Sequence, residues 1–518
     1  MKKRTENNAK TTVFVTASFV TLLSVFKRAL GFLYRIVLSR LIGAEGVGLY
    51  QVSYSLFSVF LTIGAGGIPI TVSRLICKSK AENDPRGESG ATAAGLLLCL
   101  FLSLPVVLVL LPFCNTFGFL FSDERAVPVF RILMLGLIFS SVYAVLRGNF
   151  WGNKRFLLPS VLEIAEESVM VIAGVLLLQN VSSPLDGASK AAWAVVLSYL
   201  FSFTASVLSF FLGGGRLSTP KNALRPLFNA TLPITSVRAS GSLVNSAIAV
   251  LLPAMLVRAG ATSSEALKLF GVVSGMAMPV LMIPSTVIGS LSLVLVPELS
   301  EDFYRKNKAR LYKNLERGIG VSFLIACVLL PFFYALGGQI GAIAFSNVLA
   351  GELIEKSCPI LVPMSLTMIT TGMLNSMGFE KQTFLYYFVG AAAMLLCILL
   401  LPAVCGVYAY VIGLGASFAV TAVCNLCLLG KQCDGFFKTH GKALLGTAAR
   451  ATFALLPASL VGKLVASAFQ RCFGEVLAAV AAAFVLALVT VFLYFLFGIV
   501  TGKGLKNRLV GKKRPKMG

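Results

Sequence analysis

Long apolar runs, separated by short polar segments, follow one another along nearly the whole of this chain. Of its 518 residues, 57% are hydrophobic and 13% are charged. A soluble domain could not bury so much apolar surface, whereas each helix that crosses a bilayer needs about 20 mostly apolar residues. We therefore predict an all-α polytopic membrane protein with about 14 transmembrane helices. The predicted spans begin near residues 12, 50, 90, 126, 156, 188, 228, 267, 317, 353, 383, 405, 445 and 475.

The distribution of basic residues predicts the orientation of the chain in the membrane. With the N-terminus in the cytoplasm, cytoplasmic tails and loops hold 32 of the 45 Lys and Arg residues, outside loops hold 8, and 5 lie within spans. This asymmetry is typical of membrane proteins, whose cytoplasmic loops are enriched in cations. An even number of spans returns the C-terminus to the cytoplasm. The basic C-terminal tail should contact membrane lipid headgroups, and no nucleic-acid partner is expected despite the net charge of +24.

A polar stretch with Gly and Pro near the middle of the chain divides the predicted spans into two halves. We expect an N-terminal six-helix lobe at residues 1–212, a cytoplasmic linker at 213–227 and a C-terminal six-helix lobe at 228–430. A final helix pair at 431–500 and a basic cytoplasmic tail at 501–518 complete the expected organisation. No cleavable signal peptide is expected, because the first apolar run has full length, carries charges and lacks a small-residue cleavage site.

Three cations lie inside the first predicted span. Lys27, Arg28 and Arg35 fall on one helical stripe with Ser24 and Gly31. A cation at the centre of a bilayer costs about 2.5–3.5 kcal/mol, so three on one face should line a wet cavity rather than face lipid. A cationic cavity implies an anionic cargo, and the planar guanidinium group suits phosphate. Two alternatives stay open: these cations pair with buried carboxylates, or the span begins later and some of them reach the membrane surface.

A second group of polar residues lies in the fifth and seventh predicted spans. Glu163, Glu166 and Glu167 share one helical face of the fifth span, while Arg238 and Asn245 share a face of the seventh. A salt bridge between Glu163 and Arg238 would act as a gate between the two halves. The carboxylates could instead couple transport to protons or cations, since neighbouring buried carboxylates disfavour each other's charge. Structural pairing with the cations of the first span is the third interpretation.

The second helix of each predicted half is interrupted by glycine and proline. Irregular backbone within a membrane is tolerated only beside protein or a water-filled cavity, so matched interruptions point to a transport site. Ordinary kinks are the alternative, since Gly and Pro are common in membrane helices. We predict hinges at Gly64, Gly66, Gly67 and Pro69 in the first half, and at Pro279 and Pro284, flanked by Gly275 and Gly289, in the second.

Few residues of the chain suit catalysis. His440 is the only histidine and lies in a predicted cytoplasmic loop, and no GxxxxGK[ST] segment is present for ATP. Most of the 11 cysteines lie in apolar spans as small hydrophobes, and the CxxC at Cys424 and Cys427 lacks the partners of a redox or metal site. We expect no catalytic residue, metal or cofactor, and leave coupling to a cation gradient or to the membrane potential open. Glu298, at the end of the eighth span, is a helix-end or gate residue.

Four segments resemble a known family. They are FKRALGFLYRIVLSRLIGAEGVGLYQ, GAGGIPITVSRL, LRGNFWGNKRFLLPSVLEIAEE and GMAMPVLMIPSTVIGSLSLVLVPELSE. They resemble the stage V sporulation protein B family, a branch of the multidrug/oligosaccharidyl-lipid/polysaccharide exporter superfamily that also contains the peptidoglycan lipid II flippases. The resemblance covers essentially the whole chain. It implies two inverted-V lobes of six helices around a central cavity, alternating access, and a polyprenyl-diphosphate-linked sugar as cargo in a bacterial cytoplasmic membrane.

The resemblance also bears on single residues. In lipid II flippases the first helix contributes cavity arginines within a Ser-Arg-x-x-Gly-Phe pattern, and the comparable sequence here is KRALGF at 27–32. Arg28 matches the pattern directly, whereas Arg35 lies one residue away from its next arginine. Those flippases also have a cavity arginine on the second helix. Arg74 lies at the cytoplasmic end of the corresponding helix here, which implies a gate position or a different cargo.

These observations favour a non-hydrolytic flippase that moves a polyprenyl-diphosphate-linked saccharide from the inner to the outer leaflet, for peptidoglycan, polysaccharide or spore-cortex synthesis. A cation-coupled multidrug antiporter of the same fold is the nearest alternative, but the first two helices offer it only Glu45, in the outer loop. A membrane-embedded glycan transferase, for which only the Glu163 cluster qualifies, and a non-transporting envelope scaffold are alternatives of other classes. The expected partners are a lipid-linked anionic saccharide, membrane lipids and other envelope-synthesis proteins.

Overall fold

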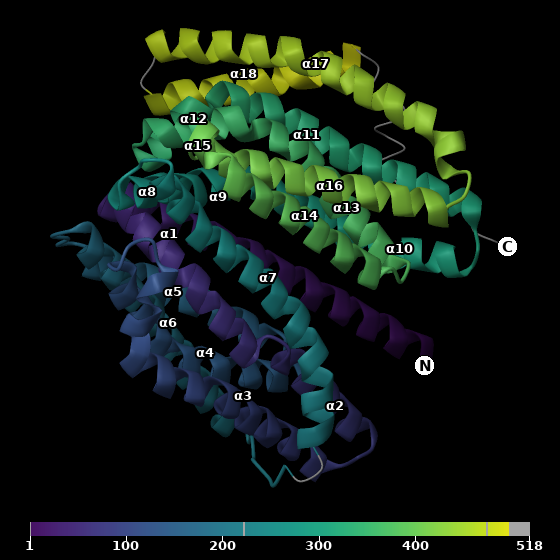
Figure 1. Cartoon of the computed structure of the whole chain (residues 1–518). Helices are drawn as coiled ribbons and strands as arrows, with labels where there is room; N and C mark the ends of the chain where they lie inside the picture. The colour runs from purple at the N-terminus through teal and green to yellow at the C-terminus, as the bar shows by residue number, and fades with distance from the viewer. Residues whose placement is uncertain (1, 221–222, 473–474, 497–518) are drawn as a thin grey trace. The chain divides into compact units, whose positions relative to one another are not determined.

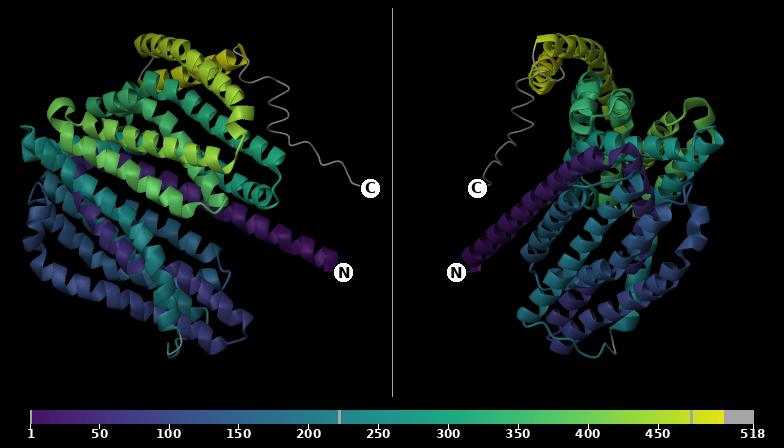
Figure 2. Two further views of the ribbon diagram at one scale, coloured as in Figure 1. Left: turned by 45° about the vertical axis from the view of Figure 1, so that its right-hand side comes forward. Right: turned by 90° about the vertical axis from the view of Figure 1, so that its left-hand side faces the viewer.

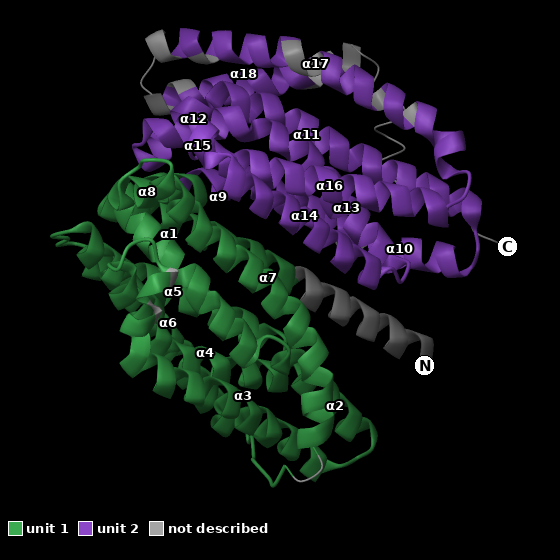
Figure 3. Cartoon of the chain, viewed as in Figure 1, with its two compact units in different colours: residues 1–275 green, residues 276–518 purple. Residues whose placement is uncertain are grey.

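The computed structural model describes residues 2–220, 223–472 and 475–496, and every regular element in these ranges is a helix (Figure 1). The chain forms two compact units, residues 1–275 and 276–518 (Figure 3). Within each unit the long helices run side by side (Figure 2). The predicted basic tail at 501–518 lies outside the described residues.

Unit 1 contains the helices of the predicted N-terminal lobe together with α7 and α8. Three of them begin at a residue that caps the free backbone N–H groups: Asp84 before α3, Ser183 before α6 and Thr262 before α8. The helices of unit 1 are α1 (Lys2–Ala65), α2 (Ile68–Ala81), α3 (Pro85–Phe113), the short 3-10 helix η1 (Cys114–Leu120), α4 (Ala126–Gly152), α5 (Leu157–Leu177), α6 (Pro184–Leu212), α7 (Leu224–Arg258) and α8 (Ser263–Phe270).

Helix α4 lies at the centre of unit 1. It packs against α1, α2, α3 and α6, and side chains such as Leu133, Leu137 and Val145 have no exposed surface. Other faces of the same helices carry large apolar side chains that are more than half exposed, among them Phe101 and Leu108. Apolar side chains exposed on helices of this length are suited to contact with lipid.

Unit 2 is built in the same way from the remaining helices. Its core lies between α10, α11, α13 and α16, with Ile288, Leu299 and Leu315 fully buried, while α18 packs on α17. A π-helical turn, η2 (Gly271–Ala277), leads into it. The helices are α9 (Met278–Leu281), α10 (Ile283–Tyr304), α11 (Lys308–Phe345), α12 (Val348–Ser357), the 3-10 turn η3 (Cys358–Ile360), α13 (Leu361–Ser376), α14 (Glu380–Leu400), α15 (Pro402–Cys405), α16 (Tyr408–Gln432), α17 (Phe436–Cys472) and α18 (Glu475–Leu496).

Among the described residues, twelve helices are long and apolar enough to cross a membrane, and a shorter apolar stretch lies at Ala479–Thr490. The all-α polytopic fold is therefore confirmed. The first two predicted spans lie within the apolar stretch Phe19–Ala81, in which α1 consists of two helical segments that meet at a kink at Gly43, whose backbone is not helical. Helix α5 has spanning length but carries three glutamates, and the eighth predicted span is divided into Ser263–Leu281 and Ile283–Tyr304.

The two compact units do not divide at the predicted linker. Their boundary lies between Gly275 and Met276, because α7 and α8 pack with α1. Residues 213–220, the described part of the linker before α7, contain no helix. The organisation into two six-helix lobes at 1–212 and 228–430 and a final helix pair at 431–500 therefore stays a prediction.

Both predicted helix interruptions coincide with breaks in the backbone. The run Gly64 to Pro69 contains the end of α1 at Ala65 and the start of α2 at Ile68. The second interruption separates α9 from α10 at Met282, and Pro279 and Pro284 lie in the first turns of these helices, where proline needs no hydrogen-bond donor. The role of either break as a hinge stays a prediction.

Candidate functional site

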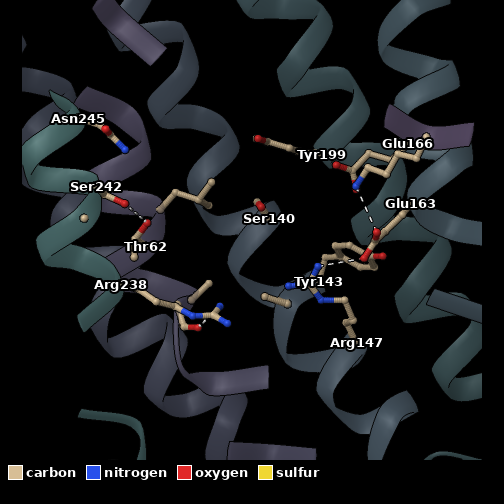
Figure 4. A pocket seen from close by; sticks show the side chains of 16 residues that line it. Thr62, Ser140, Tyr143, Arg147, Glu163, Glu166, Tyr199, Arg238, Ser242 and Asn245 are labelled. Atoms are coloured by element: carbon tan, nitrogen blue, oxygen red, sulfur yellow. Dashed lines mark hydrogen bonds and ion pairs between the residues drawn. The ribbon is translucent and has the colours of Figure 1, made fainter. Parts of the chain in front are cut away.

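A polar cavity of about 540 Å³ lies inside unit 1, between α1, α4, α5, α6 and α7 (Figure 4). Charged and hydroxyl-bearing side chains form much of its lining, which is unusual inside a membrane bundle and indicates a place for water or a polar ligand. The lining residues are Lys27, Leu61, Thr62, Ala65, Gly66, Ser140, Tyr143, Ala144, Arg147, Glu163, Glu166, Tyr199, Arg238, Gly241, Ser242 and Asn245.

One side of the cavity is an ion-pair cluster contributed by three helices. Glu163 on α5 lies 3.2 Å from the Nζ of Lys27 on α1 and 3.1 Å from the Nη1 of Arg147 on α4. The Arg147 guanidinium also lies over the ring of Trp151, 5.1 Å from its centroid, and 5.8 Å from that of Tyr143. These contacts fix Arg147 in place, since a cation is attracted to the face of an aromatic ring.

The opposite side is formed by α7 and the break between α1 and α2 (Figure 4). Arg238 donates a 2.8 Å hydrogen bond to the carbonyl oxygen of Gly66, and the N–H of Gly67 donates to Thr235 Oγ1 at 3.0 Å. These are backbone groups at the helix break, so α7 side chains provide the hydrogen-bond partners that an unbroken helix would supply from its own backbone. Thr62 and Ser242 share a 2.8 Å hydrogen bond beside them.

The structure brings together six of the predicted residues, namely Lys27, Glu163, Glu166, Arg238, Asn245 and the predicted hinge residue Gly66, all of which line the cavity. Glu163 is paired with Lys27 and Arg147 rather than with Arg238, whose guanidinium binds Gly66 instead. The proposed Glu163–Arg238 gate contact is therefore not formed in this structure.

The other predicted site residues lie elsewhere. Arg28 and Arg35, both exposed on α1, are not part of the lining, and neither are Arg74 on α2 or Glu298 on α10. Glu167 faces α1, where its Oε1 would lie 2.7 Å from a Cβ placed on Gly31. Contact of Arg28 and Arg35 with a cargo stays a prediction.

Arg147 is the charged lining residue that the sequence interpretation missed. It lies six residues before the polar turn at Asn153, near the end of the fourth predicted span. A usable signal was present, because Tyr143 and Trp151 lie four residues before and after it and therefore on its own helical face. Aromatic residues on both sides of an arginine indicate a held guanidinium rather than one that extends into solvent.

The charge of the lining is mixed. Lys27, Arg147 and Arg238 contribute three positive charges, and Glu163 with Glu166 contributes two carboxyl groups. The cavity is therefore less cationic than three unpaired cations on α1 would make it. No group of three or more His, Cys, Asp or Glu side chains in the described residues is arranged to hold a metal ion.

Comparison with known proteins places the chain in a family. A family model described as polysaccharide biosynthesis protein matches residues 15–303, more than half of the chain. The chain belongs to the polysaccharide biosynthesis protein family. This confirms the resemblance seen in the sequence. The match covers all of unit 1 from residue 15 onward and therefore the whole lining of the cavity.

Two sporulation proteins of Bacillus subtilis (strain 168) are relatives of this polysaccharide biosynthesis family member. Stage V sporulation protein B is 26% identical over 364 residues, which cover 67% of this chain and 68% of that protein. Sporulation protein YkvU is 23% identical over 380 residues, 70% of this chain and 83% of the relative. Lipid II flippase MurJ of the same organism is 25% identical over 162 residues, 30% of each chain.

Solved structures of transporters share the fold. A multidrug resistance MATE family transporter of the MOP superfamily, in an inward-facing conformation, aligns with a TM-score of 0.65 at 15% identity, over 80% of this chain and 96% of the transporter. Lipid II flippase MurJ, in an inward closed conformation, gives 0.65 at 14% identity, over 93% of this chain and all of MurJ. The polysaccharide biosynthesis family member thus shares the all-helical fold of these multi-pass membrane proteins.

Proposed function

We propose that this membrane protein is a flippase that moves a polyprenyl-diphosphate-linked saccharide from the inner to the outer leaflet of the bacterial cytoplasmic membrane. The observation that carries the proposal is the polar cavity of unit 1, in which Lys27, Arg147 and Arg238 present cations inside a membrane bundle. Family membership and the relation to MurJ support a lipid-linked saccharide as the cargo. The orientation with both termini in the cytoplasm is part of the proposal.

The chemistry of the cavity suits a phosphorylated headgroup. Guanidinium and ammonium groups replace part of the hydration that a diphosphate loses on leaving water. Hydroxyl and amide side chains, among them Ser140, Ser242 and Asn245, offer hydrogen bonds to sugar hydroxyls. The prenyl tail stays in lipid while the headgroup crosses, and exposure of the cavity alternates between the two sides of the membrane. No step of this cycle breaks a covalent bond, so the protein acts as a transporter rather than an enzyme.

The test is translocation in vesicles that contain the purified protein and a fluorescent lipid-linked sugar. A membrane-impermeant quencher measures how much of the probe reaches the outer leaflet. We expect protein-dependent flipping that Arg238→Ala lowers at least about tenfold, since loss of a charge-assisted hydrogen bond costs about 1.5–3 kcal/mol. Arg258→Ala is the matched control, because Arg258 ends the same helix and is not part of the lining.

The same vesicles separate the alternatives. Two carboxyl groups, those of Glu163 and Glu166, face the cavity, which is the feature that a cation-coupled drug antiporter would need. Efflux of a cationic drug without flipping of the lipid would favour that function. Transfer of sugar between lipids without flipping would favour a glycan transferase, and absence of all three activities would favour a scaffold.

A further inference from the structure

Glu163 is bound in the cavity in the manner of a small anionic ligand. Its two carboxylate oxygens are divided between two cations, with Oε2 on Lys27 at 3.2 Å and Oε1 on Arg147 at 3.1 Å. The three residues come from α1, α5 and α4, and their side chains are 24–32% exposed. The group that lies between the two cations, at the wall of the cavity, is thus itself an anion.

Arg147 is used only in part by this carboxylate. Glu163 contacts Nη1, while the buried Nε of Arg147 has no hydrogen-bond partner among the described residues. A guanidinium group binds carboxylate or phosphate best through two parallel N–H groups. A buried N–H donor without a partner is costly, so the resting contact leaves binding capacity unused.

We propose that Lys27 and Arg147 form the diphosphate seat of the cavity and that Glu163 is a built-in competitor, which occupies the seat when the cavity is empty and is displaced by the headgroup. The inference deepens the proposed function and rests on it. A diphosphate carries more negative charge than a carboxylate and more acceptor oxygens. One phosphate can therefore contact the Lys27 ammonium while the other binds the parallel N–H groups of Nε and Nη2 of Arg147, whereas the carboxylate here contacts Arg147 through Nη1.

The aromatic contacts explain how Arg147 keeps its position when the headgroup replaces Glu163. Trp151 and Tyr143 are on α4 with Arg147 and hold its guanidinium 5.1 and 5.8 Å from their ring centroids, independently of Glu163. When the carboxylate leaves, Arg147 stays oriented, and only Glu163 has to find a new position. Return of Glu163 to the cations after transport would help to expel the headgroup. Competition by Glu163 thus weakens binding of the headgroup but speeds its release.

The chain offers a reporter at this place, because it has two tryptophans and one of them is Trp151. Trp193 lies on α6, is 41% exposed and is not part of the lining, so Trp193→Phe leaves Trp151 as the single tryptophan. We would titrate this protein in detergent with inorganic pyrophosphate. Calorimetry measures the affinity, and Trp151 emission reports whether the guanidinium beside the indole changes its surroundings.

Glu163→Gln should bind pyrophosphate about tenfold more tightly than the parent, since a competing charge-assisted contact is gone. Glu166→Gln is the matched control: it removes a carboxylate from the same helix and the same lining but none that contacts Arg147. Its gain in affinity should be clearly smaller. The gain of Glu163→Gln should vanish when Arg147→Met is added, and pyrophosphate should change Trp151 emission only while Arg147 is present.

An equal gain in both glutamine variants, or a gain that persists without Arg147, would overturn the proposal, since general electrostatics would then explain it. Should Glu163→Gln not fold, Arg147→Lys decides, because it keeps the charge and removes the fork. Unchanged pyrophosphate affinity in Arg147→Lys would also overturn the seat. If the pyrophosphate affinities change as expected but the protein does not flip lipid, only the proposed function is rejected. If the protein flips lipid but Glu163→Gln and Glu166→Gln gain the same affinity, only the role of Glu163 as a competitor is rejected.

Discussion

Arg238 on α7 donates a 2.8 Å hydrogen bond to the carbonyl oxygen of Gly66, in the two-residue break between α1 and α2. One side chain thus serves two purposes: it satisfies a backbone group that the broken helix leaves free, and it places a cation at the cavity. The relationship explains why a cation in the seventh predicted span and a glycine-rich interruption in the second belong to the same site.

The two purposes of Arg238 can be separated. Arg238→Met should lower transport at least about tenfold, since both the charge and the donor are lost. Thr235→Val removes the other hydrogen bond to the break, that to the Gly67 N–H, without removing a charge. We expect it to lower the melting temperature while retaining most of the transport. Equal transport in the two variants would show that the break, and not the cation, is what the activity requires.

Charge exchange tests the partner of Glu163. Glu163→Arg should inactivate the protein, because it places three cations together, and Arg147→Glu in the same chain should restore part of the activity since the pair is then reversed. Arg238→Glu should not restore it, because Arg238 contacts Gly66 instead. Complementation of a strain depleted of the protein, at equal membrane levels, is the measurement. Rescue by Arg238→Glu alone would instead support the gate contact.

Close helix packing next to the break gives a prediction on stability. A Cβ on Gly148 of α4 would lie 2.5 Å from the carbonyl oxygen of Pro69 at the start of α2. Gly148→Ala should destabilise the protein by about 1–3 kcal/mol, because backbone cannot move aside as a side chain tip can. Gly320→Ala on α11 is the control, since nothing lies within 4 Å of its added Cβ. Thermal unfolding in detergent should show a loss for the first variant and none for the second.

Water access to the cavity can be mapped with single cysteines in a protein whose own cysteines are replaced. Ser242→Cys and Asn245→Cys, both in the lining, should react with a membrane-impermeant maleimide. Ala249→Cys lies on the same helix but is 98% buried, so it should stay unlabelled. Arg28→Cys tests whether the first-helix cations reach the same water. Failure of both lining positions to react from either side would remove the aqueous cavity from the mechanism.

A pH dependence is expected in the turn before α4. Burial opposes ionisation of Asp123, but hydrogen bonds from Arg125 hold the pKa of its carboxyl below the ordinary value. A lowered pKa in the folded protein means that the stabilisation is present above the ordinary pKa of an aspartate and is lost as pH falls through the lowered value. Asp123→Asn should therefore lower the melting temperature at neutral pH and weaken its fall in acid. Identical acid profiles would show that the pair contributes nothing.

Much of the fold could be predicted from local patterns. Each apolar run forms a helix because lipid forces the backbone to satisfy its own hydrogen bonds. Gly64 to Pro69 and Pro279 to Pro284 coincide with breaks because glycine is a poor helix former and proline is accommodated best in the first turn of a new helix. The number of spans follows less directly from such patterns, since the eighth predicted span forms two helices, Ser263–Leu281 and Ile283–Tyr304.

Local sequence patterns are enough to predict that helices cross a membrane and that cations and carboxylates lie within them. The tertiary structure shows that Lys27, and not its neighbour Arg28, reaches the cavity, because adjacent positions on a helix point about 100° apart. It also decided that Glu163 binds Lys27 and Arg147, which are 136 and 16 residues away in sequence. A charged side chain in a low-dielectric interior needs an opposite charge nearby. The packing of the other helices determines which residue provides that charge, and no local sequence pattern contains this information.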